Sequence, residues 1–341
     1  MGDTALTSVD DLIAAGLASS GDADILQRIA QDFRIRITPT MQQSAPGITA
    51  QFLPDPRELR THPSELPDPI GDQAHSPTPG LTHRYPDRVI LHITQTCDVY
   101  CRFCFRREVV GAAGPLPGDQ LDIALDYIAQ HPAIHEVILT GGDPMTLSPR
   151  RLDSILSRLE SIPHVDIIRF HSRVPVVTPE RVETLIPVLH QRQTAIFVVI
   201  HTNHPDELTP AARTAITLLA NAGLPLLSQT VLLRGINNCT ETLTALFRTL
   251  TALRVTPYYL HHCDLARGTS HFRTKIDEGL AIMTALRGHL SGIALPRYVL
   301  DLPGGYGKVP LNSDAVRRIG PGHWQIRDWQ GGIHDYTDII G

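Results

Sequence analysis

From Val89 onward, short runs of β-forming residues alternate with segments whose apolar residues recur every three to four positions. The predicted strands are residues 89–94, 136–140, 167–171, 196–200, 226–233, 256–260 and 296–300. Predicted helical faces between them include Leu152, Ile155, Leu156 and Leu159, and further along Leu243, Leu246, Phe247, Leu250 and Leu253. This alternation is typical of repeated βα units around a parallel sheet. Six or more consecutive units predict an α/β protein with a full or partial (β/α) barrel, and a doubly wound open sheet is the alternative.

Composition narrows the class of protein further. The chain has 341 residues, of which 42% are hydrophobic, so it can bury a large core. Its net charge of -5 provides no basic field for nucleic acid or an anionic membrane. The first residues, MGDTALTSVDDLIAAGL, lack the positive charges of a signal peptide, and no apolar stretch is long enough to span a bilayer. We therefore expect a soluble, cytoplasmic protein.

The first 80 residues differ from the rest of the chain. They are rich in Pro, Asp and Ser, and they contain one predicted helix at residues 22–33. We expect three parts: an N-terminal extension over residues 1–80 that packs as an arm, a barrel core over residues 81–300, and a C-terminal segment over residues 301–341.

Polar or glycine-rich sequence follows several of the predicted strands. These stretches read TQTCDVYCRFCFRR, TGGDP, HSRVP, HTNHP and HHCDLARG. In parallel βα folds, the carboxyl ends of the strands form the active-site face. Several polar clusters on one rim therefore predict an enzyme.

Three of the five cysteines, Cys97, Cys101 and Cys104, lie within eight residues of one another. Such clustering indicates metal ligation in a reducing compartment rather than disulfide bonds. A structural zinc normally takes four ligands, and the other two cysteines, Cys239 and Cys263, are distant in sequence. A [4Fe–4S] cluster held by three thiolates leaves one iron free to bind a substrate group. We predict such a cluster, used for redox chemistry; a structural zinc or three packing cysteines are the alternatives.

The segment CDVYCRFC resembles the cluster motif of the radical S-adenosylmethionine (SAM) superfamily, whose fold is a partial (β/α)6 barrel. The resemblance implies that SAM binds the open iron and that the reduced cluster cleaves it to a 5′-deoxyadenosyl radical. It also implies that SAM contacts come from the rim motifs. The implied contacts are Gly141, Gly142, Asp143, Ser172, Arg173, His201 and Gln229. In this interpretation the glycines let backbone approach the ligand and Asp143 accepts from the SAM amino group, although a Gly-Gly-Asp triplet alone is more often an ordinary turn.

Over about residues 75–335, the chain is similar to the lysine 2,3-aminomutase family. The similarity is carried by PGLTHRYPDRV, CRFCFRR, HSRVPVVTPERV, LLSQTVLLRGINN, PYYLHHCDLARGTSHFRT and DLPGGYGKVP. The family uses pyridoxal 5′-phosphate (PLP) together with SAM to move the α-amino group of lysine to its β-carbon. The similarity therefore implies an isomerase with three cofactors: the cluster, SAM and PLP.

Residue roles follow from the same similarity. Lys308, in the glycine-rich segment GGYGK, would bond PLP covalently, although a solvated surface lysine is the default for this residue type. Arg84 and Arg88 would bind the PLP phosphate, and an ion pair on the surface is the alternative for either.

Substrate contacts are implied in the same way. Arg106 would bind the α-carboxylate of the substrate. Asp264 and Asp301 would hold the ε-ammonium of lysine, and the net negative pocket would reject glutamate. Because Asp301 precedes Lys308 by only seven residues, we expect both residues on one loop.

The chain departs from the family pattern at two points. Family members that act on free lysine carry C-terminal cysteines that bind zinc with a residue matching Cys239; no cysteine follows Cys263 here, so Cys239 is expected to be a free, buried thiol. His261 replaces a tyrosine and matches shorter relatives that serve elongation factor P, whereas DLPGGYGKVP keeps the free-lysine pattern.

We predict a lysine 2,3-aminomutase that supplies β-lysine to elongation factor P through its lysyl ligase, and we expect a homo-oligomer. Stand-alone β-lysine synthesis, in metabolism or for an osmolyte, is the first alternative. The others are an aminomutase for a different amino acid and a noncatalytic iron–sulfur carrier.

Overall fold

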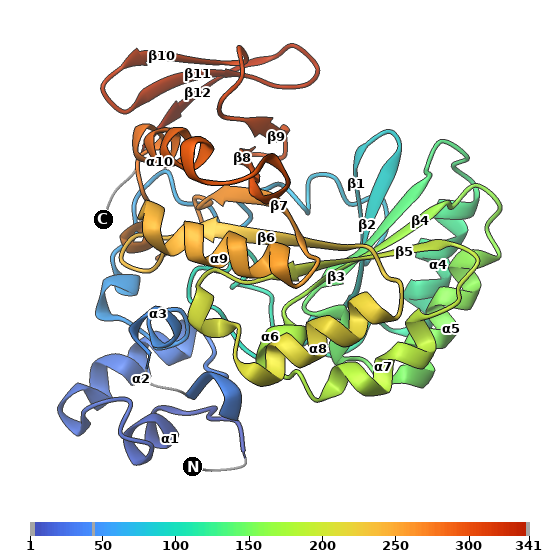
Figure 1. Cartoon of the computed structure of the whole chain (residues 1–341), viewed down its shortest axis with the longest axis horizontal. Helices are drawn as coiled ribbons and strands as arrows, with labels where there is room; N and C mark the ends of the chain where they lie inside the picture. The colour runs from blue at the N-terminus through green and yellow to red at the C-terminus, as the bar shows by residue number, and fades with distance from the viewer. Residues whose placement is uncertain (1–3, 43–44, 339–341) are drawn as a thin grey trace.

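The computed structural model describes residues 4–42 and 45–338, and its centre is a nine-stranded sheet with the strand order β1 to β9. Seven consecutive strands pair in parallel: β2 (Arg88–Thr94), β3 (Glu136–Gly141), β4 (Ile167–Ser172), β5 (Ala195–His201), β6 (Leu226–Leu232), β7 (Thr256–His262) and β8 (Arg297–Leu302). Antiparallel strands β1 (Leu81–Tyr85) and β9 (Gly307–Pro310) flank them. The sheet curves into a barrel that stays open, because within the described residues β1 and β9 do not pair (Figure 1).

One long helix follows each of the strands β2 to β7. The helices are α4 (Gly118–Ala129), α5 (Pro149–Glu160), α7 (Arg181–Leu189), α8 (Pro210–Asn221), α9 (Thr240–Ala252) and α10 (Ile276–His289), with the short α6 (Val174–Val177) ahead of α7. The predicted partial (β/α)6 barrel is therefore confirmed, and the doubly wound alternative is wrong.

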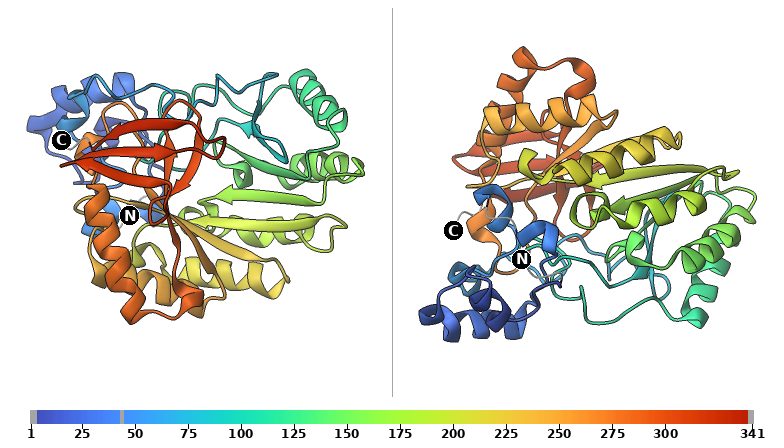
Figure 2. Two further views of the ribbon diagram at one scale, coloured as in Figure 1. Left: turned by 90° about the horizontal axis from the view of Figure 1, so that it is seen from above. Right: turned by 60° about the horizontal axis from the view of Figure 1, so that its bottom comes forward.

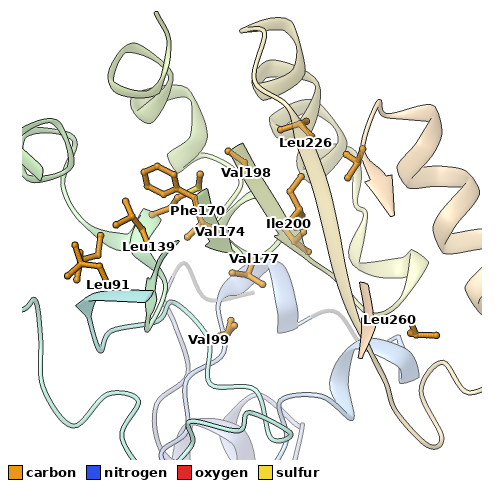
Figure 3. Packing of buried hydrophobic residues seen from close by; sticks show 14 of the residues in the cluster. Leu91, Val99, Leu139, Phe170, Val174, Val177, Val198, Ile200, Leu226 and Leu260 are labelled. Atoms are coloured by element: carbon orange, nitrogen blue, oxygen red, sulfur yellow. The ribbon is translucent and has the colours of Figure 1, made fainter. Parts of the chain in front are cut away.

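Alternation along the strands explains how the helices attach. One labelled side chain from each of β2 to β7 is at most 4% exposed and packs on the helix side of the sheet (Figure 3): Leu91, Leu139, Phe170, Val198, Leu226 and Leu260. Burying each such side chain stabilises the fold by about 1.5–3 kcal/mol. Their immediate neighbours in sequence point to the inside of the barrel, because successive strand residues face opposite sides.

The N-terminal part contains more helix than the single one predicted. The expected helix is α2 (Ala23–Asp32), and it is preceded by α1 (Val9–Ala14) and followed by α3 (Pro46–Thr49). A capping box starts α1, with Ser8 Oγ accepting from Asp11 N at 3.1 Å and Asp11 accepting from Ser8 N at 2.9 Å. Short 3-10 helices connect the remaining segments of the chain: η1 (Ser20–Asp22), η2 (Pro39–Gln42), η3 (Pro56–Leu59), η4 (Pro144–Thr146), η5 (Pro205–Glu207), η6 (Ser270–Phe272) and η7 (Gly292–Ala294).

The C-terminal residues form a separate antiparallel sheet that was not predicted. Its strands are β10 (Val316–Gly320), β11 (His323–Arg327) and β12 (Ile333–Thr337). In Figures 1 and 2 this sheet lies beside β8, β9 and α10, next to the open side of the barrel. Asp338 fastens it there, because its carboxylate accepts from Trp324 Nε1 at 3.2 Å and from Ile276 N, at the start of α10, at 3.2 Å.

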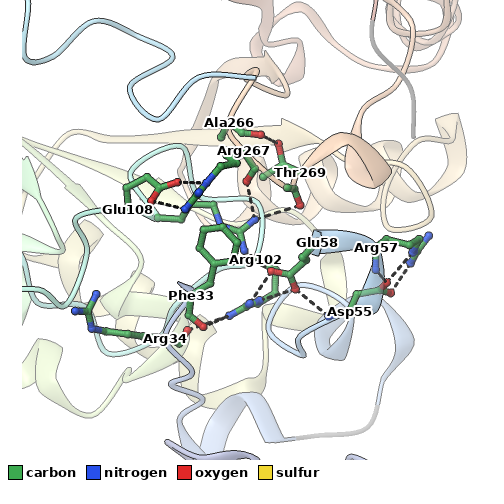
Figure 4. A network of polar contacts seen from close by, with 12 residues as sticks. Phe33, Arg34, Asp55, Arg57, Glu58, Arg102, Glu108, Ala266, Arg267 and Thr269 are labelled. Carbon is green, nitrogen blue, oxygen red and sulfur yellow. Dashed lines mark hydrogen bonds and ion pairs between the residues drawn. The ribbon is translucent and has the colours of Figure 1, made fainter. Parts of the chain in front are cut away.

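A buried carboxylate joins the N-terminal part to the cysteine-bearing loop after β2 (Figure 4). Glu58, at the end of η3, is 1% exposed and accepts from Arg102 Nε at 2.9 Å and Arg102 Nη2 at 2.6 Å. Arg107 binds the same carboxylate, and Arg102 Nη1 also donates to Arg34 O at 2.9 Å. A carboxylate without these cations would carry a large desolvation cost, so both arginines are fixed in place.

We expect Glu58→Gln to destabilise the protein strongly, because it leaves Arg102 and Arg107 buried without a counter-charge. The free energy of unfolding should fall by about 3–5 kcal/mol, measured by urea denaturation. The matched control is Asp122→Asn, which breaks the exposed ion pair with Arg158. It should change stability by less than about 1 kcal/mol. Equal stability of Glu58→Gln and the control would contradict the structural role of this network.

Candidate active site

The inside of the barrel holds a cavity of about 780 Å³. Alternate strand residues line it, and in β4 these are Ile167, Arg169 and His171. Every site residue predicted from the sequence also lines this one cavity, namely Arg84, Arg88, Cys97, Cys101, Cys104, Arg106, Gly141, Gly142, Asp143, Ser172, Arg173, His201, Gln229, Asp264, Asp301 and Lys308. The predicted residues, which span more than 220 positions of sequence, therefore meet in one place, and their individual roles stay predictions.

The three clustered cysteines are free thiols on the loop that follows β2. Burial raises the pKa of the Cys104 thiol to about 11, and it raises those of Cys97 and Cys101 as well. A cationic metal centre offsets this cost, because metal ligation requires and stabilises the thiolate. Arg173 Nη1 also donates to Cys101 Sγ at 2.7 Å. Three half-buried thiols that line one cavity, one of them already beside a cation, form a donor set that fits an iron–sulfur cluster.

Within the described residues, no group of three His, Cys, Asp or Glu side chains is placed to hold a single metal ion. In a [4Fe–4S] cluster each thiolate bonds a different iron, so its protein ligands need not converge on one point. The spacing of Cys97, Cys101 and Cys104 around one cavity is compatible with that arrangement.

The Gly-Gly-Asp turn after β3 packs against the chain itself. Gly141 has a φ of +110°, and a Cβ on it would lie 2.5 Å from Thr94 O, while a Cβ on Gly142 would collide with Thr96 O. The glycines are thus required because the turn touches the loop leading to Cys97. The expected close approach to a ligand remains a prediction, since this internal contact already explains both residues.

Asp143 acts as an internal acceptor between the ends of β3 and β4. Its carboxylate accepts from Ser172 Oγ at 2.7 Å, Arg173 N at 2.6 Å, Met145 N at 3.0 Å and Val174 N at 3.2 Å. Burial raises its pKa to about 6 against these hydrogen bonds. The structure therefore gives Asp143 a positioning role, and its contact with the amino group of SAM stays a prediction.

Strands β4 and β5 each contribute a cavity-lining histidine with one ring nitrogen that has no hydrogen-bond partner in the described part of the chain. His201 Nε2 and His171 Nε2 are both buried and have no hydrogen-bond partner among the described residues. His171 Nδ1 lies 3.0 Å from Gln229 Oε1, which fixes the ring and the amide relative to each other. Unsatisfied buried nitrogens are costly, so both rings are suited to hydrogen-bond a polar ligand.

Lys308 and Asp301 face each other across a β-hairpin, rather than lying on one loop as predicted. Strands β8 and β9 pair so that Asp301 stands opposite Lys308, and Lys308 Nζ lies 2.7 Å and 2.6 Å from the two Asp301 oxygens. Tyr85 OH accepts from Lys308 N at 2.8 Å. Gly307 has a φ of +95°, and a Cβ there would lie 2.6 Å from Tyr85 OH, so glycine is required beside the lysine.

Asp264 and Asp301 have opposite electrostatic environments. Burial, together with the charge of Asp301, raises the pKa of Asp264 to about 7. Burial acts in the same direction on Asp301, but the Lys308 ammonium and the His261 ring outweigh it and lower the pKa of Asp301. His261 Nδ1 lies 3.5 Å from Asp301 Oδ2. In the cavity, Asp301 thus has a cation partner at hydrogen-bonding distance, whereas Asp264 is costly to ionise.

Two of the predicted arginines, Arg84 and Arg106, pair with Asp72, a residue that the sequence did not single out. Arg106 Nε donates to Asp72 Oδ2 at 2.7 Å, and Arg84 lies 3.6 Å from Asp72 Oδ1 and 3.8 Å from Asp301 Oδ1. Arg84 Nε is buried without a hydrogen-bond partner, which suits an anionic ligand. Arg88 is more open; it pairs with Asp87 at 2.5 Å and stacks over the Tyr85 ring at 3.8 Å.

Several cavity residues were missed in the sequence. The inward positions of the predicted strands would have identified Glu136, Arg169, His171 and Tyr259, which line the cavity because they alternate with buried apolar residues. No sequence pattern pointed to Trp329, which reaches the cavity from the turn between β11 and β12.

The position of Cys239 differs from the expected buried one. The residue is free, as predicted, but exposed rather than buried, because it occupies the N-cap position of α9. Its Sγ donates to Thr242 Oγ1 at 3.0 Å.

None of the helices in the described part of the chain is both long and apolar enough to cross a membrane.

Comparisons with known proteins agree with this geometry. Residues 91–246 match the family model described as "Radical SAM superfamily", and residues 283–339 match the one described as "Lysine-2,3-aminomutase". L-lysine 2,3-aminomutase from Fusobacterium nucleatum is 41% identical over 98% of this chain and 80% of its own length. The enzyme of the same name from Clostridium subterminale is 41% identical over 86% of this chain and 71% of its own length. Glutamate 2,3-aminomutase from Clostridioides difficile is 34% identical over 98% and 80%, respectively.

The open (β/α) barrel, the cysteine triplet on the loop after β2 and the family match define a radical SAM enzyme. The two L-lysine 2,3-aminomutases are each 41% identical to this chain over more than two thirds of their own length. The C-terminal match covers the segment that includes Lys308. The chain belongs to the lysine 2,3-aminomutase family and is therefore an isomerase.

We expect Asp264→Asn and Asp301→Asn to have opposite effects on stability. In the folded chain the pKa of Asp264 is raised from 3.8 to about 7. Its ionisation therefore opposes folding progressively as the pH rises from about 4 to 7. Asp264→Asn removes this cost and should raise the free energy of unfolding at pH 8 by on the order of 2–4 kcal/mol, with no gain at pH 4.

Asp301 supplies the matched control. Its pKa is lowered on folding, so its ionised form stabilises the fold above its unfolded pKa, and that contribution is lost as the pH falls through the folded pKa. Asp301→Asn should therefore destabilise the protein at pH 8. Both variants are measured by urea unfolding without added PLP. A destabilising Asp264→Asn at pH 8 would show that the assigned asymmetry is wrong.

Proposed function

We propose that the protein is a lysine 2,3-aminomutase that converts α-lysine to β-lysine inside the barrel. The observation that carries the proposal is the presence of Asp264 and Asp301 in the cavity that also contains the three clustered cysteines and Lys308. Two carboxylates attract a side-chain ammonium and repel the side-chain carboxylate of glutamate. This charge pattern favours lysine, although a glutamate 2,3-aminomutase is among the relatives.

The cysteines and the rim residues would bind the radical-generating cofactors. We assign Cys97, Cys101 and Cys104 to a [4Fe–4S] cluster. SAM would be bound by residues after β3 to β6, with the unpartnered His201 Nε2 as one donor or acceptor. When bound, the cluster and SAM supply a carbon radical that removes a hydrogen atom from the substrate. The chain contributes a fixed cavity wall, because Asp143, Ser172 and Arg173 lock the strand ends together.

PLP would be bound by the opposite part of the cavity. Lys308 is assigned to covalent attachment, and Arg84 and Arg88 to the phosphate, for which the unpartnered Arg84 Nε is available. When bound, PLP supplies an aldehyde that holds the migrating amino group. In this proposal residues 301–341 form the PLP-lysine segment, after the extension over 1–80 and the barrel core over 81–300.

The remaining residues would orient the substrate. Arg106 is assigned to the α-carboxylate of the substrate. That carboxylate would either replace Asp72, which lies 2.7 Å from Arg106 Nε, or bind Arg106 together with it. A guanidinium has five N–H donors, so it can bind two carboxylates at once. Enclosing the reacting atoms in the barrel also keeps water from the radical.

We further propose that the β-lysine is used to modify elongation factor P. His261 supports this use because it matches the shorter relatives that serve that factor. The DLPGGYGKVP segment favours stand-alone synthesis of β-lysine instead. The clustered thiols support a reducing, cytoplasmic location. Exposed Ile319, Trp329 and Ile333 on the C-terminal sheet support a homo-oligomer.

We expect the reconstituted enzyme to rearrange lysine in preference to other amino acids. The protein is incubated anaerobically with SAM, PLP, dithionite and one of L-lysine, L-glutamate, L-arginine or L-ornithine. The products are identified by chromatography and mass spectrometry. β-Lysine should be the main product, because the carboxylates of Asp264 and Asp301 in the cavity attract a side-chain ammonium.

Two variants complete this experiment. Cys97→Ala should lose both iron and activity, whereas Cys239→Ala, at an exposed position away from the cavity, should keep both. Rearrangement of glutamate rather than lysine would overturn the substrate proposal. Full activity of Cys97→Ala would overturn the cluster assignment. Failure of the unchanged protein to rearrange any of these amino acids would favour the noncatalytic alternative.

We expect elongation factor P from cells that lack this gene to lose its β-lysyl group. Intact-mass measurement of the purified factor, with and without the gene, checks this outcome. The group should return when β-lysine is added to the medium, because only its supply is missing. An unchanged mass together with a fall in free β-lysine would favour the stand-alone role.

A further inference from the structure

The free amino group of Lys308 pairs with Asp301, which is one of the two carboxylates that the proposed substrate ammonium would bind. Lys308 Nζ lies 2.7 Å from Asp301 Oδ1 and 2.6 Å from Asp301 Oδ2, so it contacts both carboxylate oxygens. The Asp301 side chain is 5% exposed, whereas that of Lys308 is 32% exposed. The lysine therefore reaches from the cavity onto a buried anion, where an ion pair is stronger than at a surface.

The other neighbours of Asp301 are weaker partners. His261 Nδ1 lies 3.5 Å away, and burial lowers the pKa of His261, so the ring is neutral near pH 7. Arg84 Nη1 lies 3.8 Å away and is shared with Asp72. Lys308 is therefore the only cation within hydrogen-bonding distance of the Asp301 carboxylate among the described residues.

Asp264 is in a different situation. It lines the same cavity, but among residues 4–42 and 45–338 no side chain pairs with or donates to its carboxylate. Asp264 is half-buried, and a carboxylate that is partly removed from water is costly to ionise without a partner. A ligand cation would relieve that cost. Asp264 is therefore available to an incoming ammonium, whereas Asp301 is already occupied.

We propose that Lys308 is an internal competitor of the substrate side-chain ammonium. This inference rests on the proposed function. While its amino group is free, Lys308 holds Asp301 and leaves only Asp264 for the substrate. When the amino group gives a proton to solvent and its nitrogen bonds the aldehyde carbon of PLP, one water leaves and Asp301 becomes available. Lysine then meets two open carboxylates, so attachment of PLP promotes tight substrate binding.

His261 has a positioning role in this exchange. When Lys308 leaves, the neutral ring still faces Asp301 Oδ2 and can donate a hydrogen bond to it. The carboxylate is then held in place while the partner cation changes from Lys308 to the substrate.

The test measures binding rather than turnover. The full-length, cluster-reconstituted protein is prepared without PLP and titrated with L-lysine by calorimetry. Norleucine, which has the lysine carbon chain but no ammonium, is the control ligand. Lys308→Met removes the competing cation and should bind lysine about tenfold or more tightly than the unchanged protein, because a buried anion gains a new partner. Norleucine should bind both proteins equally.

Two further variants complete the test. Lys308→Arg keeps a cation opposite Asp301 and should bind lysine as weakly as the unchanged protein, which also controls for general disturbance of the hairpin. Lys308→Met combined with Asp301→Asn should lose the gain, because the freed carboxylate is gone.

The possible outcomes separate this inference from the proposed function. Equal lysine affinity of Lys308→Met and the unchanged protein, both still preferring lysine over norleucine, would overturn the competition and leave the substrate proposal standing. If neither protein prefers lysine over norleucine, the acidic pair does not recognise the ammonium. In that case the proposed substrate role and the competition both fail.

Discussion

Strand alternation in an open barrel is the constraint on which the rest of this structure depends. Each of β2 to β7 directs apolar side chains such as Leu139 and Phe170 to the helices, so the next position along the strand must face inward. In this chain many inward positions are polar, including Thr140, Arg169, His171 and Gln229. Polar groups cannot pack into a dry core without partners, so the interior remains a cavity lined by hydrogen-bonding groups. The same pattern that fixes the fold therefore creates the site.

Polar groups line the cavity, and only some of them have a hydrogen-bond or ion-pair partner among the described residues. Asp72 and Asp301 have cationic partners, whereas the Asp264 carboxylate has none among the described residues. His171 Nε2 and His201 Nε2 likewise lack a hydrogen-bond partner there. Leaving such groups buried costs stability, and their persistence is typical of a site that binds a polar ligand. The Glu58 network is different, because its buried carboxylate pairs with both Arg102 and Arg107.

Regular patterns in the sequence were sufficient to predict the barrel, and the candidate site residues line one cavity inside it. All seven predicted strands occur within two residues of their expected ends, because β-rich runs between helical patterns are strong local signals. The C-terminal sheet was not predicted, since its short strands are mostly exposed and lack a clear alternation. Asp72 was missed because it lies in an irregular segment, and only the three-dimensional fold brings it to Arg106. Cys239 was expected to be buried because a thiol is usually buried, but its position at a helix start exposes it.

The hairpin of β8 and β9 shows why sequence spacing alone does not define the site. Seven residues separate Asp301 from Lys308, which is compatible with one loop, but Gly304, Gly305 and Gly307 all adopt positive φ and turn the segment into a paired hairpin. That hairpin is held from outside the barrel. The Tyr306 ring lies 3.9 Å from the His334 ring of β12, and Trp329 packs beside Tyr85, whose hydroxyl accepts from Lys308 N.

The C-terminal sheet therefore helps to position the backbone beside Lys308. A Cβ at position 307 would lie 2.6 Å from Tyr85 OH and 3.2 Å from Trp329 Cδ1, so the backbone beside Lys308 is clamped between the first strand of the barrel and the last sheet. Asp328 holds the Trp329 turn by accepting from Gln330 N at 2.8 Å and Gly332 N at 2.9 Å. Because Tyr85 of β1 and the turn between β11 and β12 hold the backbone at residues 307 and 308, Lys308 has a defined position opposite Asp301. In the proposed exchange, a lysine held in this way would compete with a substrate ammonium at one defined carboxylate.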